Sequence, residues 1–203
     1  MILPIVAYGD SILRKKAAEV EKNHPGLKEL IADMFETMHE APGVGLAAPQ
    51  IGQSIRLFVV DSEQLFREDD EDSEKSKNNG KPKFTGQPIK EVFINPTIVK
   101  EFGKKWVYEE GCLSIPGIRE DVERDDTVLI QYYDQDFNFR EKEFDGITAR
   151  IVQHEYDHIE GVLFIDHIKA LKRQLLKSKL AAISRGEVEV AYKMAFPLQK
   201  KKR

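Results

Sequence analysis

The segment 147–160, ITARIVQHEYDHIE, carries the strongest structural signal in the sequence. An α-helix turns by about 100° per residue, so His154 and His158 would lie one turn apart on one face, in line with Ile147 and Ile151. Most of the other positions are apolar as well, which leaves only a narrow polar strip. Because a helix that is apolar on most sides is normally buried, we expect this one to lie at the centre of the protein.

The flanking sequence predicts two more helices and several strands. Apolar residues recur every three or four positions over 27–38, where Pro42 and Gly43 end the helix, and a second, basic helix is expected over 169–184. Short β-branched and aromatic runs predict strands at 55–61, 92–94, 127–133 and 139–144. The link between the last two strands is too short for a crossover. We therefore expect an α+β fold, with antiparallel sheets around the central helix and a further C-terminal helix.

The composition is typical of a single folded domain that covers residues 1–203. Of these 203 residues, 41% are hydrophobic and 33% are charged, which excludes disordered and fibrous proteins. No apolar stretch approaches the roughly 20 residues that span a bilayer, and no basic residues precede the apolar N-terminus as they would in a secretory signal. A net charge of −4 argues against nucleic-acid binding by the body of the protein. We expect no membrane partner and no sequence-specific nucleic acid.

Two segments are expected to extend from this domain. Residues 62–90 contain the acidic run EDDEDSE at 68–74, followed by a stretch rich in Lys, Asn, Gly and Pro. This composition predicts a flexible surface insertion, with a binding segment for a basic partner as the alternative. A basic tail is expected at 198–203.

The His-Glu-x-x-His pattern at 154–158 predicts a metal site. Two imidazoles on one helical face can bind one ion, whereas buried histidines without partners would be costly. Glu155 lies about 100° around the helix from His154, where it could reach a water molecule on the ion and act as a general base. The alternative is a pair of core histidines that bond to their neighbours.

A catalytic site of this kind usually takes a third protein ligand. The metzincin pattern would require a histidine at position 164, where this chain has Phe164. A gluzincin-like glutamate would have to be Glu160, Glu187 or Glu189, which lie either one turn away or outside a convincing helix. Cys112 is the only thiol in the chain, and a thiolate is a strong ligand for transition metals. We therefore predict that the metal ligands are Cys112, His154 and His158. With one cysteine no internal disulfide can form, so a cytoplasmic location is expected.

Three segments, in this order, together resemble the signature motifs of the peptide deformylase family. They are Gly43-Val44-Gly45-Leu46-Ala47-Ala48-Pro49-Gln50, Glu110-Gly111-Cys112-Leu113-Ser114 and Gln153-His154-Glu155-Tyr156-Asp157-His158. The resemblance extends from near Ile5 to Asp166. The 61 positions between Gln50 and Cys112 make this spacer longer than in compact members of the family, because it contains the acidic run.

The resemblance implies a metal-dependent hydrolase that removes the N-formyl group from the initiator methionine of nascent polypeptides and releases formate. In such an enzyme Glu155 would be the catalytic acid and base. The side-chain amide of Gln50 and the backbone N–H of Leu113 would stabilise the developing oxyanion.

The glycines around Val44 would allow a substrate peptide to approach the backbone as an added strand. The resemblance implies that Gly45 makes such a backbone contact, with Gly43 and Val44 beside it. The alternative for this glycine pattern is ordinary helix termination after Ala41.

Cysteine and imidazole ligands suit several divalent metals. The resemblance implies Fe²⁺ as the physiological ion, with Zn²⁺, Ni²⁺ or Co²⁺ as possible substitutes. Two other functions stay open: a metallopeptidase that uses the same helix, and a non-catalytic ribosome-binding protein whose structural metal has His167 as fourth ligand. The basic helix and tail would allow transient ribosome docking, although a solvated helix face and a frayed tail are the favoured explanation of their charge.

Overall fold

The computed structural model describes residues 1–67 and 84–198 of the chain, which form the predicted α+β fold. Five strands make one sheet in the order β2-β3-β4-β5-β6, and all neighbours are antiparallel. Their bounds are Gly45–Ala47 (β2), Leu57–Asp61 (β3), Lys90–Cys112 (β4), Ile115–Tyr133 (β5) and Phe139–Asp145 (β6). The strand β2 therefore lies at one edge of the sheet, and no other described strand pairs with its outer side.

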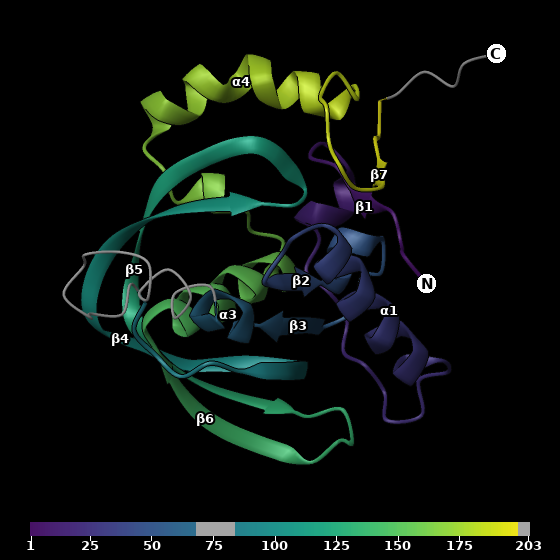
Figure 1. The fold of residues 1–203 in the computed structure, drawn as a ribbon, viewed down its shortest axis with the longest axis vertical. Coiled ribbons are helices and arrows are strands. Elements are labelled where there is room, and N and C mark those ends of the chain that lie inside the picture. Colours follow the sequence, from purple (N-terminus) through teal and green to yellow (C-terminus); the bar gives the residue numbers. More distant parts are fainter. Residues whose placement is uncertain (68–83, 199–203) are drawn as a thin grey trace.

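The hairpin of β4 and β5 is much longer than the predicted strands at 92–94 and 127–133. Its register shifts at four places, between Ile94 and Thr97, Ile98 and Lys100, Phe102 and Lys105, and Gly111 and Cys112. Irregularities of this kind bend and twist a ladder. The hairpin therefore curves around the centre of the molecule instead of lying flat (Figure 1).

The predicted central helix is present as α3, Gly146–Glu160, surrounded by the curved hairpin, β2 and β3 (Figure 1). It ends at Gly161, whose left-handed backbone (φ 77°) lets its N–H donate to the carbonyls of Asp157 and His158. Most of its side chains are buried. The remaining predicted helices are α1, Leu27–Glu40, and α4, Ala170–Ser184. Short 3₁₀ turns occur at Ser11–Arg14 (η1), Ala48–Ile51 (η2) and Phe164–Asp166 (η3).

A second sheet joins the two ends of the described chain. It consists of β1, Ile5–Val6, and β7, Met194–Ala195, which pair in parallel. Two-residue strands carry no alternating pattern, so the sequence did not predict them. The pair brings the C-terminal segment back onto the body of the domain (Figure 1).

The predicted insertion at 62–90 differs from the expectation at both of its described ends. Ser62 and Ile89 are buried, and residues 63–67 are helical, with Leu65 and Phe66 packed against the main core. These ends belong to the folded domain because their apolar side chains have core neighbours. The acidic run at 68–74 lies outside the described residues, as does the basic tail beyond position 198, so their flexibility stays a prediction.

Within the part of the chain that the structure describes, no helix combines the length and apolar character needed to cross a membrane.

Candidate metal centre and active site

The structure brings the three predicted metal ligands together. Cys112 stands at the end of β4, and His154 and His158 project from one face of α3. One ligand atom from each residue lies within 4.8 Å of the other two, and Cys112 Sγ is 3.3 Å from His158 Nε2. Nitrogen and sulfur ligands of one tetrahedral ion lie about 3.5 Å apart, given metal distances of roughly 2.0–2.3 Å. The donor set and its spacing therefore fit one divalent transition metal.

The electrostatics of this site favour a thiolate at Cys112. Burial opposes its ionisation, but the neighbouring charge of His158 and hydrogen bonds with both histidines lower the pKa of Cys112 to about 5. The sulfur is therefore ionised at neutral pH, which is the form that binds metals.

A buried carboxylate orients His154. Glu110 stands two residues before Cys112 on β4, and its Oε2 is 2.9 Å from His154 Nδ1. Burial opposes ionisation of Glu110, but His154 and Arg124 hold the pKa of its carboxyl well below its usual range. The carboxylate therefore accepts a hydrogen bond from the Nδ1–H of His154, which leaves Nε2 for the metal.

Two arginines also donate hydrogen bonds to the carboxylate of Glu110. Arg124 donates to both of its carboxylate oxygens, at 2.6 and 3.0 Å, and Arg150 donates to Oε1 at 2.7 Å. The Arg150 guanidinium also lies 4.3 Å from the centre of the Trp106 ring. Sequence reasoning assigned no role to Glu110, Arg124 or Arg150. The available signal was that Glu110 and Cys112 share a face of a strand, since side chains alternate along it.

Glu155 lies inside the site next to β2. Its side chain is buried, its Oε2 has no hydrogen-bond partner among the described residues, and burial raises its pKa to about 7. A Cβ atom added at Gly45 would come within 2.4 Å of Glu155 Oε1. Position 45 therefore requires glycine, because the carboxylate of Glu155 occupies the space that a side chain at this position would need.

Gln50 is another predicted site residue. Its side chain is held so that the amide nitrogen points toward the predicted metal ligands. Its Oε1 accepts from the Ala47 N–H at 2.8 Å. Its Nε2 lies 3.5 Å from Cys112 Sγ and 3.4 Å from Ser114 Oγ. This geometry leaves Nε2 as the donor that faces the site.

A cavity of about 810 Å³ opens onto these residues. It is lined by Gly43, Val44 and Gly45, by the end of β4, and by Leu113 in the turn that follows β4. The Val44 carbonyl accepts from the Asp61 N–H of β3. Since successive residues of a strand direct their backbone groups to opposite sides, Gly45 directs its N–H and C=O away from β3. The edge of β2 is thus free to pair with an extended peptide.

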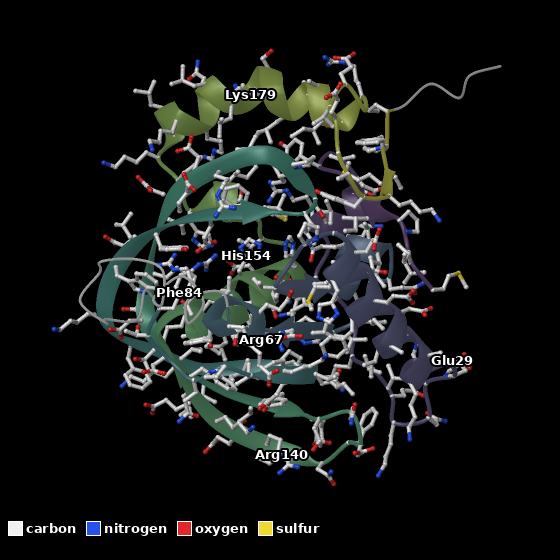
Figure 2. All side chains as sticks on the ribbon, viewed as in Figure 1. Glu29, Arg67, Phe84, Arg140, His154 and Lys179 are labelled. Carbon is white, nitrogen blue, oxygen red and sulfur yellow. The ribbon has the colours of Figure 1, made fainter. Side chains whose placement is uncertain are left out.

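The other candidate ligands from the sequence have different partners. Glu160 forms ion pairs with Arg56 and Lys16, and His167 bonds to Asp157 at 2.8 Å. Phe164 stacks beside His154 instead of supplying a ligand. Figure 2 shows His154 in the interior of the molecule. The arrangement keeps one side of the three ligands open to the cavity, as a catalytic site requires.

Two histidines and a cysteine around a buried glutamate, at the end of a peptide-sized cavity, define a metal-dependent hydrolase. The chain belongs to the polypeptide deformylase family, whose family model matches residues 2–174. Enzymes of this family remove the N-formyl group from nascent polypeptides, and this chain is a hydrolase of that kind. The metallopeptidase and the non-catalytic alternatives are not favoured.

Comparison with individual proteins gives the same result. The chain is 51% identical over 200 residues to a peptide deformylase from Cytophaga hutchinsonii, an alignment that covers 98% of this chain and 100% of that protein. It is 37% identical to the crystal structure of a peptide deformylase from Legionella pneumophila, with 92% and 98% of the two chains covered and a TM-score of 0.74. The crystal structure of a peptide deformylase from Ehrlichia chaffeensis in complex with actinonin shares 30% identity, with 93% and 99% covered and a TM-score of 0.75.

Proposed function

We propose that Cys112, His154 and His158 hold the catalytic metal of this deformylase and that Glu155 is its acid and base. The observation that carries the proposal is the convergence of these four side chains, of which Cys112, His154 and Glu155 line the cavity. A divalent ion held there would supply a water molecule of lowered pKa and a positive charge beside the formyl oxygen.

Glu155 moves the proton. With a pKa of about 7, raised by burial, its carboxyl group can both accept and return a proton near neutral pH. It takes a proton from the attacking water. It then delivers this proton to the α-amine of the methionyl peptide, as the bond between that nitrogen and the formyl carbon breaks. One group can serve both steps because its buried Oε2 has no hydrogen-bond partner among the described residues.

Gln50 and Leu113 stabilise the charge that develops on the formyl oxygen. The carbonyl oxygen of the Gln50 side chain is held by the Ala47 N–H, so its Nε2 donates toward the reacting centre. The Leu113 N–H is the second donor, from the turn that follows Cys112. Donors fixed before the reaction need no reorganisation, and each typically contributes about 3 kcal/mol.

The substrate peptide lies along the outer edge of β2. The free N–H and C=O of Gly45 pair with its backbone, with Gly43 and Val44 beside it, and the cavity receives the methionine side chain. Apolar walls from Val44, Ile147 and Ile151 suit that side chain.

We also propose Fe²⁺ as the physiological ion and the cytoplasm as the place of action. The choice of Fe²⁺ rests on the family resemblance, since donor chemistry alone does not rank Fe²⁺ above Zn²⁺, Ni²⁺ or Co²⁺. The cytoplasmic location rests on the resemblance and on the single cysteine, which cannot form an internal disulfide. Higher turnover with Zn²⁺ than with anaerobically loaded Fe²⁺ would contradict the choice of metal.

Transient docking to the ribosome is a further part of the proposal. The helix α4 exposes Leu171 and Leu175, which are 72% and 74% accessible, on a surface that also carries basic residues. The basic residues on and next to the helix are Lys169, Lys172, Arg173, Lys177 and Lys179. Lys179 lies on the outer surface, away from the metal site (Figure 2). Cosedimentation with ribosomes that weakens with salt, and is lost when these basic residues are replaced by Gln, would support docking.

The decisive test is release of formate from a formyl-methionyl tripeptide. The protein is purified without oxygen, loaded with Fe²⁺ or Zn²⁺, and assayed together with its metal content. Formate release from the formyl peptide, with no cleavage of the matching acetyl peptide, is expected. Cleavage of internal peptide bonds without formate release would contradict the proposal.

A further inference from the structure

The C-terminal segment follows the part of the chain that the family model matches, and it packs against the active-site cavity. The match ends at residue 174, whereas Glu189 to Tyr192 line the same cavity as Gly45 and Cys112. The pairing of β7 with β1 holds this segment in place: the Ile5 N–H donates to the Lys193 carbonyl at 2.9 Å. Figure 1 shows β7 beside β1 below α4. The C-terminal segment is thus a wall of the cavity.

One side chain of that wall bonds to the active-site backbone. The Tyr192 hydroxyl donates to the Leu113 carbonyl at 2.8 Å, across 79 positions of sequence. Both residues, with Met194, pack against the same hydrophobic cluster, and Tyr192 is only partly exposed. Burial raises the pKa of Tyr192 to about 12, so its hydroxyl stays protonated and can donate at neutral pH.

The bond matters because Leu113 lies in a tight turn. Cys112 at the end of β4 pairs with Ile115 at the start of β5, so Leu113 and Ser114 alone connect the two strands. The Ser114 carbonyl accepts from the Tyr8 N–H at 2.8 Å. Both carbonyls of the turn are therefore anchored, one by the N-terminal and one by the C-terminal part of the chain. Only the φ and ψ rotations of Leu113 separate this carbonyl from the Leu113 N–H, which belongs to the preceding planar peptide group. Anchoring the carbonyl therefore limits the directions that the Leu113 N–H can take.

We propose that Tyr192 is a positioning residue for the deformylase reaction: its hydroxyl holds the Leu113 carbonyl so that the Leu113 N–H faces the formyl oxygen. The inference rests on the proposed role of Leu113 as an oxyanion donor. It adds a residue outside the three sequence motifs and outside the family match. A donor that acts mainly on the developing charge affects turnover more than substrate binding.

The test compares Tyr192→Phe with Tyr133→Phe in the metal-loaded, full-length protein. Each change removes one hydroxyl and keeps the ring, and Tyr133 lies at the end of β5, where it packs against Phe137 and Phe139. With Tyr192→Phe we expect kcat to fall about fivefold, the equivalent of one hydrogen bond of about 1 kcal/mol, and KM to stay within about twofold. Metal content should match the wild type, and the melting temperature should fall by only about 2–4 °C for the lost hydrogen bond. All kinetic constants of Tyr133→Phe should match the wild type.

A readout independent of turnover is the amide spectrum of the zinc-loaded protein. The Ser114 N–H belongs to the same peptide group as the Leu113 carbonyl, so its ¹⁵N resonance should move in Tyr192→Phe and not in Tyr133→Phe. An unchanged kcat in an active enzyme would overturn the inference and leave the proposed function intact. A rise in KM alone, or loss of metal, would also overturn it, because the hydroxyl would then serve the cavity wall or Cys112. A wild-type protein that released no formate would instead refute the function itself.

Discussion

Replacement of Gly45 by alanine tests the close contact between β2 and Glu155. The new Cβ would lie 2.4 Å from Oε1 and 2.7 Å from both Cγ and Cδ of Glu155. Cβ contacts below 3.0 Å essentially do not occur, so Oε1 would have to retreat by at least 0.6 Å, from 2.4 to 3.0 Å. Gly45 is not among the residues with positive φ, so its backbone accepts alanine without strain. The substitution therefore acts on the position of the Glu155 side chain.

Two effects follow from this displacement. A misplacement of this size at a catalytic group costs about 100-fold in kcat. Overpacking of a buried site costs about 2 kcal/mol in the free energy of unfolding. The three atoms nearest to the new Cβ all belong to Glu155 and none to the proposed metal ligands, so the variant should keep its metal.

A double-mutant cycle with Glu155→Ala separates the clash from other effects of alanine in β2. The atoms that would clash are all missing in Glu155→Ala, so there the added methyl group should stabilise the protein by about 0.5 kcal/mol through the unfolded state. The expected coupling between the two positions is then about 2.5 kcal/mol, measured by urea unfolding of the four proteins. Equal costs of Gly45→Ala in both backgrounds, or full kcat in the single variant, would refute the reasoning.

Three further substitutions probe the site. Glu155→Ala should keep one metal per chain and lose formate release by a factor of about 100 or more, since no other group can carry the proton; substantial residual activity would contradict its role. Glu110→Gln should lower the free energy of unfolding by about 3 kcal/mol, because two buried arginines lose their carboxylate partner; urea titration measures this effect. It should also weaken metal binding about 10- to 100-fold, which chelator competition measures. Cys112→Ala should bind no stoichiometric metal, which elemental analysis would detect.

Much of the fold could be predicted where the sequence pattern is local. The periods of α1, α3 and α4 arise from residues three and four positions apart, and all three helices are present at nearly the expected bounds. The grouping of the cysteine and the two histidines was also predictable, because His154 and His158 share one helical face and Cys112 is the only thiol.

The long hairpin of β4 and β5 was predicted only in part. Its middle section, including Lys104, Lys105 and Glu109, is exposed and charged, so the alternation typical of a half-buried strand is weak there. Backbone pairing between the two strands maintains the ladder through these positions. The bulges that curve it around α3 have no local sequence signal.

The amino-acid pattern alone determined the central helix, the ligand types and the family, since these depend on residue identity and short spacing. Three contacts were decided by the tertiary structure alone. Glu110 bonds to His154, the Glu155 carboxylate packs against Gly45, and the Tyr192 hydroxyl donates to the Leu113 carbonyl. These pairs are separated by 44, 110 and 79 positions. Contacts over such separations depend on how the strands, the helix and the chain ends pack together, and no periodic pattern records that packing.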